Sequence, residues 1–393
     1  MLSRAFAVLA AGLLGLALVP PAQASADGEV FLVAGLRGAN EVGTAGDPDG
    51  SATVALRVAG DQVSFAIRWD KLDAPKLADI HLGAKGVNGE VKLDLVDGQL
   101  PANALGVSGT ATADPAVLSA LAADPTGFYA DLHNSAFPSG AARGQFHQVS
   151  RKVDLRGVLQ GADQATFSAE ATGTRSATWW LRPSSSALDY TITWQGVQAP
   201  TAGTVSDGAY SRTELFTTKT GLPANLTGIS GKARPVRQLD GQRASLEAPG
   251  GAVQATVSGA PFTHPRSFSA EVLLGSQIYI CANNAFGQFG VTAKLKFGID
   301  HSFVQPVTGP PQWVAADHSS VQVSSVFGRF PNGTGNIPEL VLEVSQSGAA
   351  TGLLSQATQV LRLNTQRGVA PAGPCTDGDR ASSPYKADYL FLG

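Results

Sequence analysis

Residues 62–69 read QVSFAIRW, and this stretch decides the fold class because large apolar side chains alternate with small or polar ones. An alternation with period two predicts a β-strand with one face in a core and the other toward solvent. Residues 188–194, LDYTITW, repeat the pattern and end on Trp194, which lies 125 positions after Trp69. The two stretches therefore predict equivalent strands in two copies of one β-rich unit.

Three further matches, in the same order and at nearly constant spacing, support an internal repeat. They pair Gly38-Ala39-Asn40 with Gly161-Ala162-Asp163, Ser51-Ala52-Thr53 with Ser176-Ala177-Thr178, and Leu100-Pro101-Ala102-Asn103 with Leu222-Pro223-Ala224-Asn225. A period of this size is that of a whole domain, so we expect a duplicated domain and not a solenoid. The predicted units are residues 27–150 and 151–272. Residues 273–393 align with neither and are assigned to a third, β-rich domain.

Each predicted unit has the strand and turn pattern of an antiparallel β-sandwich. Turn residues such as Gly60-Asp61 separate the alternating stretches, and strand faces this short need a second sheet to bury them. One helix is expected in the first unit, because Asp114 can cap it and Pro115 suits its first position. The third domain also alternates, for example over residues 291–297. The expected fold is therefore all-β: tandem antiparallel β-sandwich domains with short helices, after a cleaved signal peptide.

Residues 1–26 have the pattern of a secretory signal peptide. Arg4 supplies a positive charge, an uncharged apolar run follows, and Ala24-Ser25-Ala26 offers small residues for cleavage. The apolar run is shorter than a membrane-spanning helix needs, although an uncleaved anchor is the alternative. We therefore expect a protein that is secreted or held in the cell envelope, with no membrane span after cleavage.

The overall composition is that of an ordinary globular protein with little charge. A formal net charge of −3 offers no basic surface for nucleic acid. The 45 glycines favour β-structure joined by turns. Abundant alanine with little lysine suggests a bacterial origin.

The only two cysteines, Cys281 and Cys375, lie in the last third of the chain. In an oxidising compartment such a pair is expected to form a disulfide. Closing a loop of this length stabilises a fold by about 4 kcal/mol in the chain-entropy model. Two buried free thiols are the alternative.

A set of polar and glycine-containing motifs between about residues 29 and 145 resembles the CHRD (chordin-type) domain. The matching motifs, in family order, are Leu36-x-Gly38-Ala39-Asn40-Glu41-Val42, Ile80-His81-x-Gly83, Gly86-x-Asn88-Gly89, Tyr129 with His133, Phe137-Pro138-x-Gly140, and Arg143-Gly144-Gln145. The chain departs from the family where Asp79 replaces a histidine, Gly43-Thr44 replaces a proline pair, and Ala141 replaces a glutamate. The resemblance implies an extracellular interaction domain, and residues 151–272 are predicted to be a degenerate second copy.

Asp79, His81, Asp131 and His133 are the candidate ligand or metal site. Residues two apart on a strand share a side, so Asp79 lies beside His81 and Asp131 beside His133. If the two segments are neighbouring strands, two carboxylates and two imidazoles converge, which suits zinc or copper, with His81 and His133 as the metal-binding histidines. The alternative is that each histidine is hydrogen-bonded, with its aspartate fixing the tautomer.

Arg143 and Glu41 are the other polar candidates in this unit. Arg143 is expected to bridge to Glu41 or Asp131 and hold the end of the sandwich, or else to face a ligand that carries a carboxylate. The second unit has Thr204 and Ser206 where the 125-residue offset places Asp79 and His81. We therefore expect any ligand site to belong to the first unit.

The remaining motifs carry weaker signals. Asp47-Pro48-Asp49-Gly50 is expected to be a plain turn and not a calcium loop. Asp300-His301 and Asp317-His318 are expected to be solvated turn residues. We find no catalytic motif, so no catalytic residues are assigned. The sequence favours a secreted, non-enzymatic binding or cell-surface module whose partner is an extracellular protein or an envelope component. The alternative is a secreted zinc or copper protein that either sequesters the metal or uses it in redox chemistry.

Overall fold

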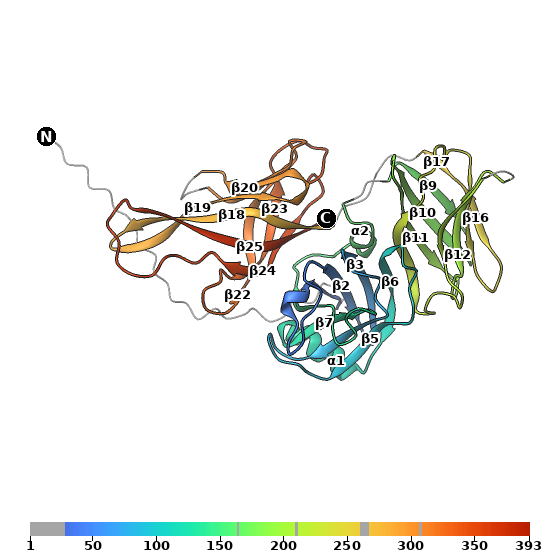
Figure 1. Ribbon diagram of the computed structural model, residues 1–393, viewed down its shortest axis with the longest axis horizontal. Coiled ribbons are helices and arrows are strands. Elements are labelled where there is room, and N and C mark those ends of the chain that lie inside the picture. Colours follow the sequence, from blue (N-terminus) through green and yellow to red (C-terminus); the bar gives the residue numbers. More distant parts are fainter. Residues whose placement is uncertain (1–27, 163–164, 209–210, 260–266, 306–308) are drawn as a thin grey trace.

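A computed structural model describes residues 28–162, 165–208, 211–259, 267–305 and 309–393 (Figure 1). The predicted signal peptide lies outside these residues. Within them, no helix is both long and apolar enough to cross a membrane. The described chain is mostly antiparallel β-structure, so the prediction of an all-β protein is confirmed.

The first unit consists of eight strands, one helix and two 3-10 turns. These elements are β1 (Val30–Arg37), η1 (Gly38–Asn40), β2 (Ser51–Ala59), β3 (Gln62–Asp70), β4 (Leu77–Leu82), β5 (Val91–Asp97), β6 (Ala104–Thr112), α1 (Pro115–Ala123), η2 (Pro125–Gly127), β7 (Phe128–His133) and β8 (Ala142–Gln148). The strands pair antiparallel in the order β6-β3-β2-β1-β8-β7-β4-β5. The predicted helix is confirmed, because the carboxylate of Asp114 accepts a hydrogen bond from the Ala116 amide at 2.8 Å.

Strand β3 contains the alternating stretch that decides the fold. The side chains of Val63, Phe65, Ile67 and Trp69 are buried in one core that runs through both sandwich units. The opposite face is not open to solvent as predicted, because Ala66 is also fully buried, against a third layer of the molecule. The alternation therefore marks the face that lies in the sandwich core, whereas burial of the other face depends on a distant segment.

Within its described residues, the second unit has one short helix and nine strands. These elements are α2 (Leu155–Gln160), β9 (Phe167–Ala171), β10 (Ser176–Pro183), β11 (Leu188–Gln195), β12 (Ala202–Ser206), β13 (Arg212–Thr217), β14 (Leu226–Ala233), β15 (Arg243–Glu247), β16 (Val253–Thr256) and β17 (Ser258–Gly259). One sheet runs β17-β9-β10-β11-β14 and the other β13-β12-β15-β16. Strand β14 pairs with β6, so the two units share one continuous 13-stranded sheet.

The two tryptophans of the sequence repeat occupy equivalent registers. Trp69 lies opposite Ala52 in the β2–β3 pair, and Trp194 lies opposite Ala177 in the β10–β11 pair. Both are buried in the same core. The strand pairing thus reproduces the spacing of the motifs in the sequence.

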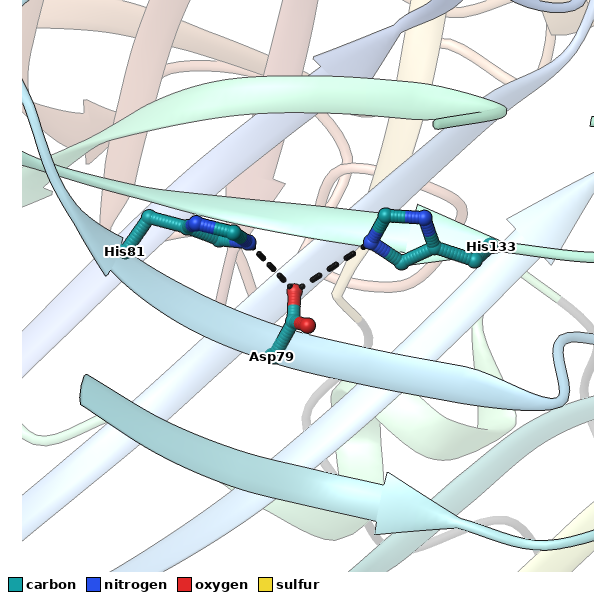
Figure 2. Close-up of side chains that lie close together, drawn as sticks. All are labelled: Asp79, His81 and His133. Carbon is teal, nitrogen blue, oxygen red and sulfur yellow. Dashed lines mark hydrogen bonds and ion pairs between the residues drawn. The ribbon is translucent and has the colours of Figure 1, made fainter. Parts of the chain in front are cut away.

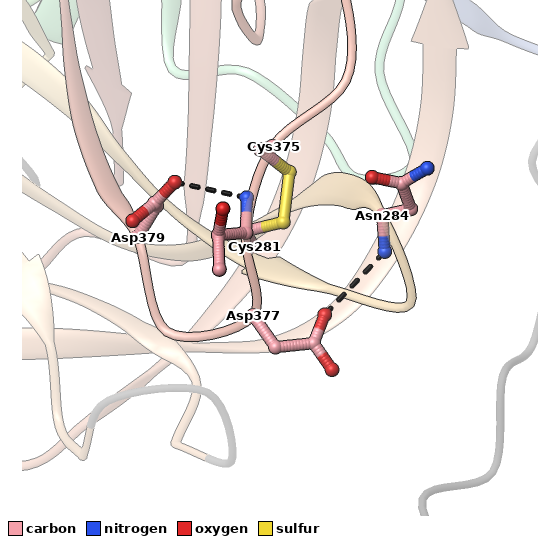
Figure 3. Close-up of a disulfide and its surroundings, with 6 residues drawn as sticks. Cys281, Asn284, Cys375, Asp377 and Asp379 are labelled. Carbon is pink, nitrogen blue, oxygen red and sulfur yellow. Dashed lines mark hydrogen bonds between the residues drawn. A yellow bond between two sulfur atoms is a disulfide. The ribbon is translucent and has the colours of Figure 1, made fainter.

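Residues 268–392 form a closed eight-stranded barrel. Its elements are β18 (Phe268–Ala282), β19 (Ala285–Leu295), η3 (Lys296–Gly298), β20 (Ile299–Phe303), β21 (Pro311–Val314), β22 (Ser320–Phe330), β23 (Glu339–Gln346), β24 (Gln359–Arg367) and β25 (Arg380–Leu392). Each strand pairs antiparallel with the next, and β25 pairs with β18 to close the barrel. The predicted disulfide is confirmed: Cys281 on β18 is bonded to Cys375, which precedes β25 (Figure 3).

The first unit lies between the second unit and the barrel (Figure 1). Apolar residues on the outer face of β1, β2 and β3, such as Phe31, pack against Leu361 and Leu390 of the barrel. Polar contacts surround this patch: Arg37 Nε donates to Asp388 Oδ2 at 2.8 Å. The barrel is therefore docked on the first unit through a mixed apolar and ionic interface.

One prediction in the barrel is wrong. His301, expected to be a solvated turn residue, lies on β20 with only 4% of its surface exposed. Its ring stacks on Trp313, with the ring centroids 4.5 Å apart. Burial lowers its pKa to about 3, so this imidazole is neutral. In contrast, Asp317 does stabilise a turn, by accepting a hydrogen bond from the Ser319 amide at 3.1 Å.

Candidate functional site

Strands β4 and β7 bring the four predicted site residues together. The strands are antiparallel neighbours, with Asp79 opposite Asp131, Leu77 opposite His133, and His81 opposite Tyr129. Because residues two apart on a strand point the same way, the two carboxylates and two imidazoles share one face of the sheet. The neighbouring strands on which the prediction depended are thus present.

Both imidazoles turn toward one carboxylate oxygen (Figure 2). His81 Nε2 lies 2.9 Å from Asp79 Oδ1, and His133 Nε2 lies 3.5 Å from the same atom. The other ring nitrogens face backbone carbonyls: His81 Nδ1 lies 2.9 Å from Gly89 O, and His133 Nδ1 lies 3.3 Å from Pro138 O. The carbonyls therefore orient the rings so that Nε2 of each points into the cluster.

The pKa values of this group follow from burial and mutual attraction. Burial alone would raise the pKa of Asp79, but the close contacts with His133 and His81 outweigh it and leave that pKa below its ordinary value. Contact with Asp79 raises the pKa of His133 to about 9, against the opposing effect of burial. Burial would lower the pKa of His81, but the hydrogen bond with Asp79 outweighs burial, so this pKa is also raised. At neutral pH and without a bound cation, the Asp79 carboxylate therefore lies between a protonated His133 and His81, whose pKa is raised.

Glu41, which follows η1, lies beside Asp131 and extends the cluster. Burial first, and then the charge of Asp131, raise the pKa of Glu41 to about 8. Burial likewise raises the pKa of Asp131 to about 6. Because two close carboxyl groups do not readily ionise together, one of the two keeps its proton at a higher pH than an isolated carboxyl group would. The sequence missed this pairing, because Glu41 and Asp131 are 90 positions apart.

Three polar atoms at the centre of this group are buried and have no hydrogen-bond partner in the described protein. They are Glu41 Oε1, Asp131 Oδ1 and His133 Nε2. Such atoms are rare in folded proteins, and each one calls for a bound ion, a water molecule or a functional role.

Arg143, on β8, has different partners from those predicted. It is almost fully buried, donates from Nη1 to Asn88 Oδ1 at 2.8 Å and from Nη2 to Val87 O at 2.6 Å, and stacks over the Tyr129 ring. The predicted bridge to Glu41 or Asp131 is wrong, because the guanidinium is occupied by the loop between β4 and β5. Arg143 thus fixes this loop, which contains the Gly89 carbonyl that orients His81.

The predicted turn at Asp47 also has a structural role. Asp47 Oδ1 accepts hydrogen bonds from the amides of Gly50 and Asp49, at 2.8 and 3.2 Å. These contacts use the carboxylate to close a tight turn, as predicted.

Comparison with protein families tests the resemblance found in the sequence. The sequence model of the CHRD domain family matches residues 32–146, which contain every residue of the cluster. This segment is a CHRD domain. A second match, to a protein family of unknown function (DUF3455), covers residues 269–393 and so coincides with the barrel. Searches of curated proteins and of solved structures gave no significant match.

The CHRD match does not extend into the second unit. The assignment of residues 151–272 as a second CHRD copy therefore stays a prediction, although the strand order of the two units is alike. As a family, CHRD domains indicate a binding or extracellular module. The polar cluster and the loop held by Arg143 lie within the part of the chain that the CHRD family covers.

Proposed function

We propose that the protein is exported and acts as a non-enzymatic binding protein of the cell surface or extracellular space. The observation that carries the proposal is the CHRD domain at residues 32–146. The disulfide between Cys281 and Cys375 supports it, because structural disulfides persist in oxidising compartments. The signal-peptide pattern of residues 1–26 supports it independently.

Export is tested by expressing the full chain in a bacterial host and fractionating the cells. We expect the protein outside the cytoplasm, with an N-terminus that begins after Ala26 and no thiol that can be alkylated. A variant that lacks residues 2–26 is the control and should stay inside the cell. Full-length protein in the cytoplasm with two free thiols would contradict the proposal.

The partner is an extracellular protein or an envelope component. Cell envelopes from the producing organism, incubated with the purified mature protein and sedimented, should retain it in a saturable way. Pretreatment of the envelopes with a protease separates the two kinds of partner, since only a protein partner would be lost. If the protein stays wholly in the supernatant after incubation with envelopes, and also binds no component of the spent culture medium, this role is ruled out.

A second candidate function is metal binding at the cluster, and one observation favours it. Asp79, His81 and His133 each offer a ligand atom, and these atoms lie within 4.8 Å of one another. Each imidazole also turns Nδ1 to a backbone carbonyl and Nε2 to the cluster, which is how histidine ligands of zinc and copper are usually oriented. Asp131, 3.8 Å from His133 Nε2, could supply a fourth ligand.

Elemental analysis of the mature protein, purified without a histidine tag, tests this second function. A bound zinc or copper ion should be present at one per chain, and His133→Gln should remove it. His318→Asn, which changes an exposed histidine of the barrel, is the matched control and should leave the metal in place. Metal-free protein whose melting temperature does not respond to added Zn²⁺ or Cu²⁺ would exclude a metal site.

A further inference from the structure

The interior of the barrel contains a cavity that is separate from the polar cluster of the CHRD domain. An antiparallel barrel of eight strands has an interior wide enough for side chains or for one small ligand. Here the side chains leave a cavity of about 490 Å³, which is within the usual range of small-molecule sites. All of its lining residues lie between residues 277 and 389, within the barrel.

The deep wall of the cavity is aromatic and apolar. His301 stacks on Trp313 with the ring planes 2° apart, and Tyr389 packs edge-on against both rings. Val291 and Leu342 add aliphatic surface to the lining. This wall suits the apolar body of a ligand, because contact with it removes apolar surface from water.

Arg362, on β24, supplies a buried positive charge to the same cavity. Only 9% of its surface is exposed. Nε and Nη2 both donate to the carbonyl of Pro338, at 3.2 and 2.8 Å. Among the residues that the structure describes, it has no carboxylate partner. A buried guanidinium without an anion is costly, so this arrangement favours a ligand that brings one.

Two further hydrogen-bond donors of the lining are buried and unpartnered in the described protein. They are Gln277 Nε2 and Trp313 Nε1. The oxygen of the Gln277 amide is already used, because it accepts from Gln288 Nε2 at 2.9 Å. The lining contains two arginines, Arg362 and the exposed Arg329, and none of its residues is an aspartate or glutamate. The cavity therefore offers donors and positive charge, and its lining lacks a negatively charged side chain.

We infer that the barrel binds a small organic carboxylate with an aromatic or aliphatic body. The carboxylate pairs with Arg362 and accepts from the neighbouring free donors, and the body lies against Trp313 and Tyr389. This inference goes beyond the proposed function of the CHRD domain and does not depend on the polar cluster there. Its failure would leave the export and envelope experiments unaffected.

The test uses two probes with one ring system, 2-naphthoate and the neutral 2-naphthalenemethanol, and a linear probe, decanoate. Titration calorimetry with the mature protein should show one site per chain for at least one of the two carboxylates. The bound carboxylate should also raise the melting temperature of the protein. No heat and no thermal shift with either carboxylate at millimolar concentration would overturn the inference.

Arg362→Gln should weaken the binding of the carboxylate about 30-fold, in line with the loss of a charge-assisted pair. It should change the affinity for the neutral alcohol little. Lys386→Gln, which removes the same charge from an exposed residue of β25, is the matched control and should bind as the unaltered protein does. If Arg362→Gln binds the carboxylate as tightly as the unaltered protein does, the assignment of the anion site is overturned.

A second variant decides the matter if Arg362→Gln does not fold. Val323→Trp keeps Arg362 and fills part of the cavity with an indole ring. It should abolish binding of every probe while the disulfide still forms. Undiminished binding in a folded Val323→Trp variant would place the probes outside the barrel and contradict the inference.

Discussion

The CHRD domain and the second unit have the same strand order but different side chains at equivalent points of the sheet. In the CHRD domain Asp79 lies opposite Asp131, whereas in the second unit Thr204 lies opposite Ser245. Glu247 takes the position of His133. It lies opposite Ala202, and His133 lies opposite Leu77, the residue 125 positions before Ala202. At these positions of the described chain, the second unit therefore forms its sheets without an imidazole–carboxylate cluster.

This difference separates what the sandwich needs from what the CHRD domain adds. Buried carboxylates and imidazoles are costly unless they pair with one another, whereas a threonine and a serine are easily accommodated. Because the second unit shows that the fold tolerates the simpler residues, formation of the sandwich does not require the cluster. Polar groups that a fold does not need are expected at functional sites.

The largest effect is expected when Asp79 is given the residue of the second unit. Asp79→Thr removes the carboxylate between two imidazoles, so the free energy of unfolding should fall by about 4 kcal/mol in the metal-free protein. Urea denaturation, followed by the fluorescence of the sandwich tryptophans, measures it. The exchange of all four residues, Asp79→Thr, His81→Ser, Asp131→Ser and His133→Glu, should recover part of the loss. A single variant as stable as the parent would show that the cluster is not a paired network.

The two units also differ in their contacts with the barrel. Among the described residues, the CHRD domain contacts a buried carboxylate of the barrel, that of Glu339, and the second unit does not. Glu339 Oε2 lies 3.2 Å from His147 Nε2, and Oε1 lies 3.1 Å from Lys85 Nζ. Burial would raise the pKa of Glu339, but His147 and then Lys85 outweigh it and lower the pKa to about 2.

The folded-state pKa of Glu339 thus lies below the unfolded value of 4.5. Its contribution, roughly 3 kcal/mol, should be complete above pH 4.5 and should be lost as the pH falls toward 2. Melting curves of the parent and of Glu339→Gln measure this difference, which should be large at pH 7 and small near pH 2. A difference in melting temperature between the two proteins that does not change with pH would contradict the predicted ionisation of Glu339.

A smaller effect is expected at Arg143, the residue that fixes the loop between β4 and β5. Arg143→Lys keeps the charge but replaces the two separate nitrogens that donate to Asn88 and Val87 with a single ammonium, so the free energy of unfolding should fall by about 2 kcal/mol. Hydrogen exchange of the Gly89 amide, whose residue contacts His81 through its carbonyl, should speed up. Exchange in β12 and β15, the strands of the second unit that correspond to β4 and β7, should remain unchanged. Unaltered exchange at Gly89 would show that the loop does not depend on Arg143.

The smallest effect should be the same in both units. Trp69→Phe and Trp194→Phe each remove part of a buried ring whose Nε1 has no hydrogen-bond partner in the described protein. Each should therefore cost only the lost packing, about 1 kcal/mol. Chemical denaturation of the two variants compares them directly. Clearly unequal losses in the free energy of unfolding would show that the two tryptophans are not equivalent in the core.

Short-range patterns in the sequence were sufficient for several features. The alternation around Trp69 predicted a core strand, Asp114 and Pro115 predicted the start of α1, and the cysteine count predicted the disulfide. The spacing of Asp79 and His81 placed both on one face of a strand. Each of these predictions depends on residues close together in the chain, or on the mere presence of a pair.

The features that needed the structure all depend on distant segments. The pairing of β6 with β14, the burial of Ala66 against the barrel, the partners of Arg143 and the contact of Glu41 with Asp131 belong to this group. So does the burial of His301 inside the barrel. The sequence by itself determined which residues form strands and which face of each is apolar, because that information repeats every two residues. Tertiary structure alone decided which faces meet and which charges pair, because these depend on how separate sheets close on one another.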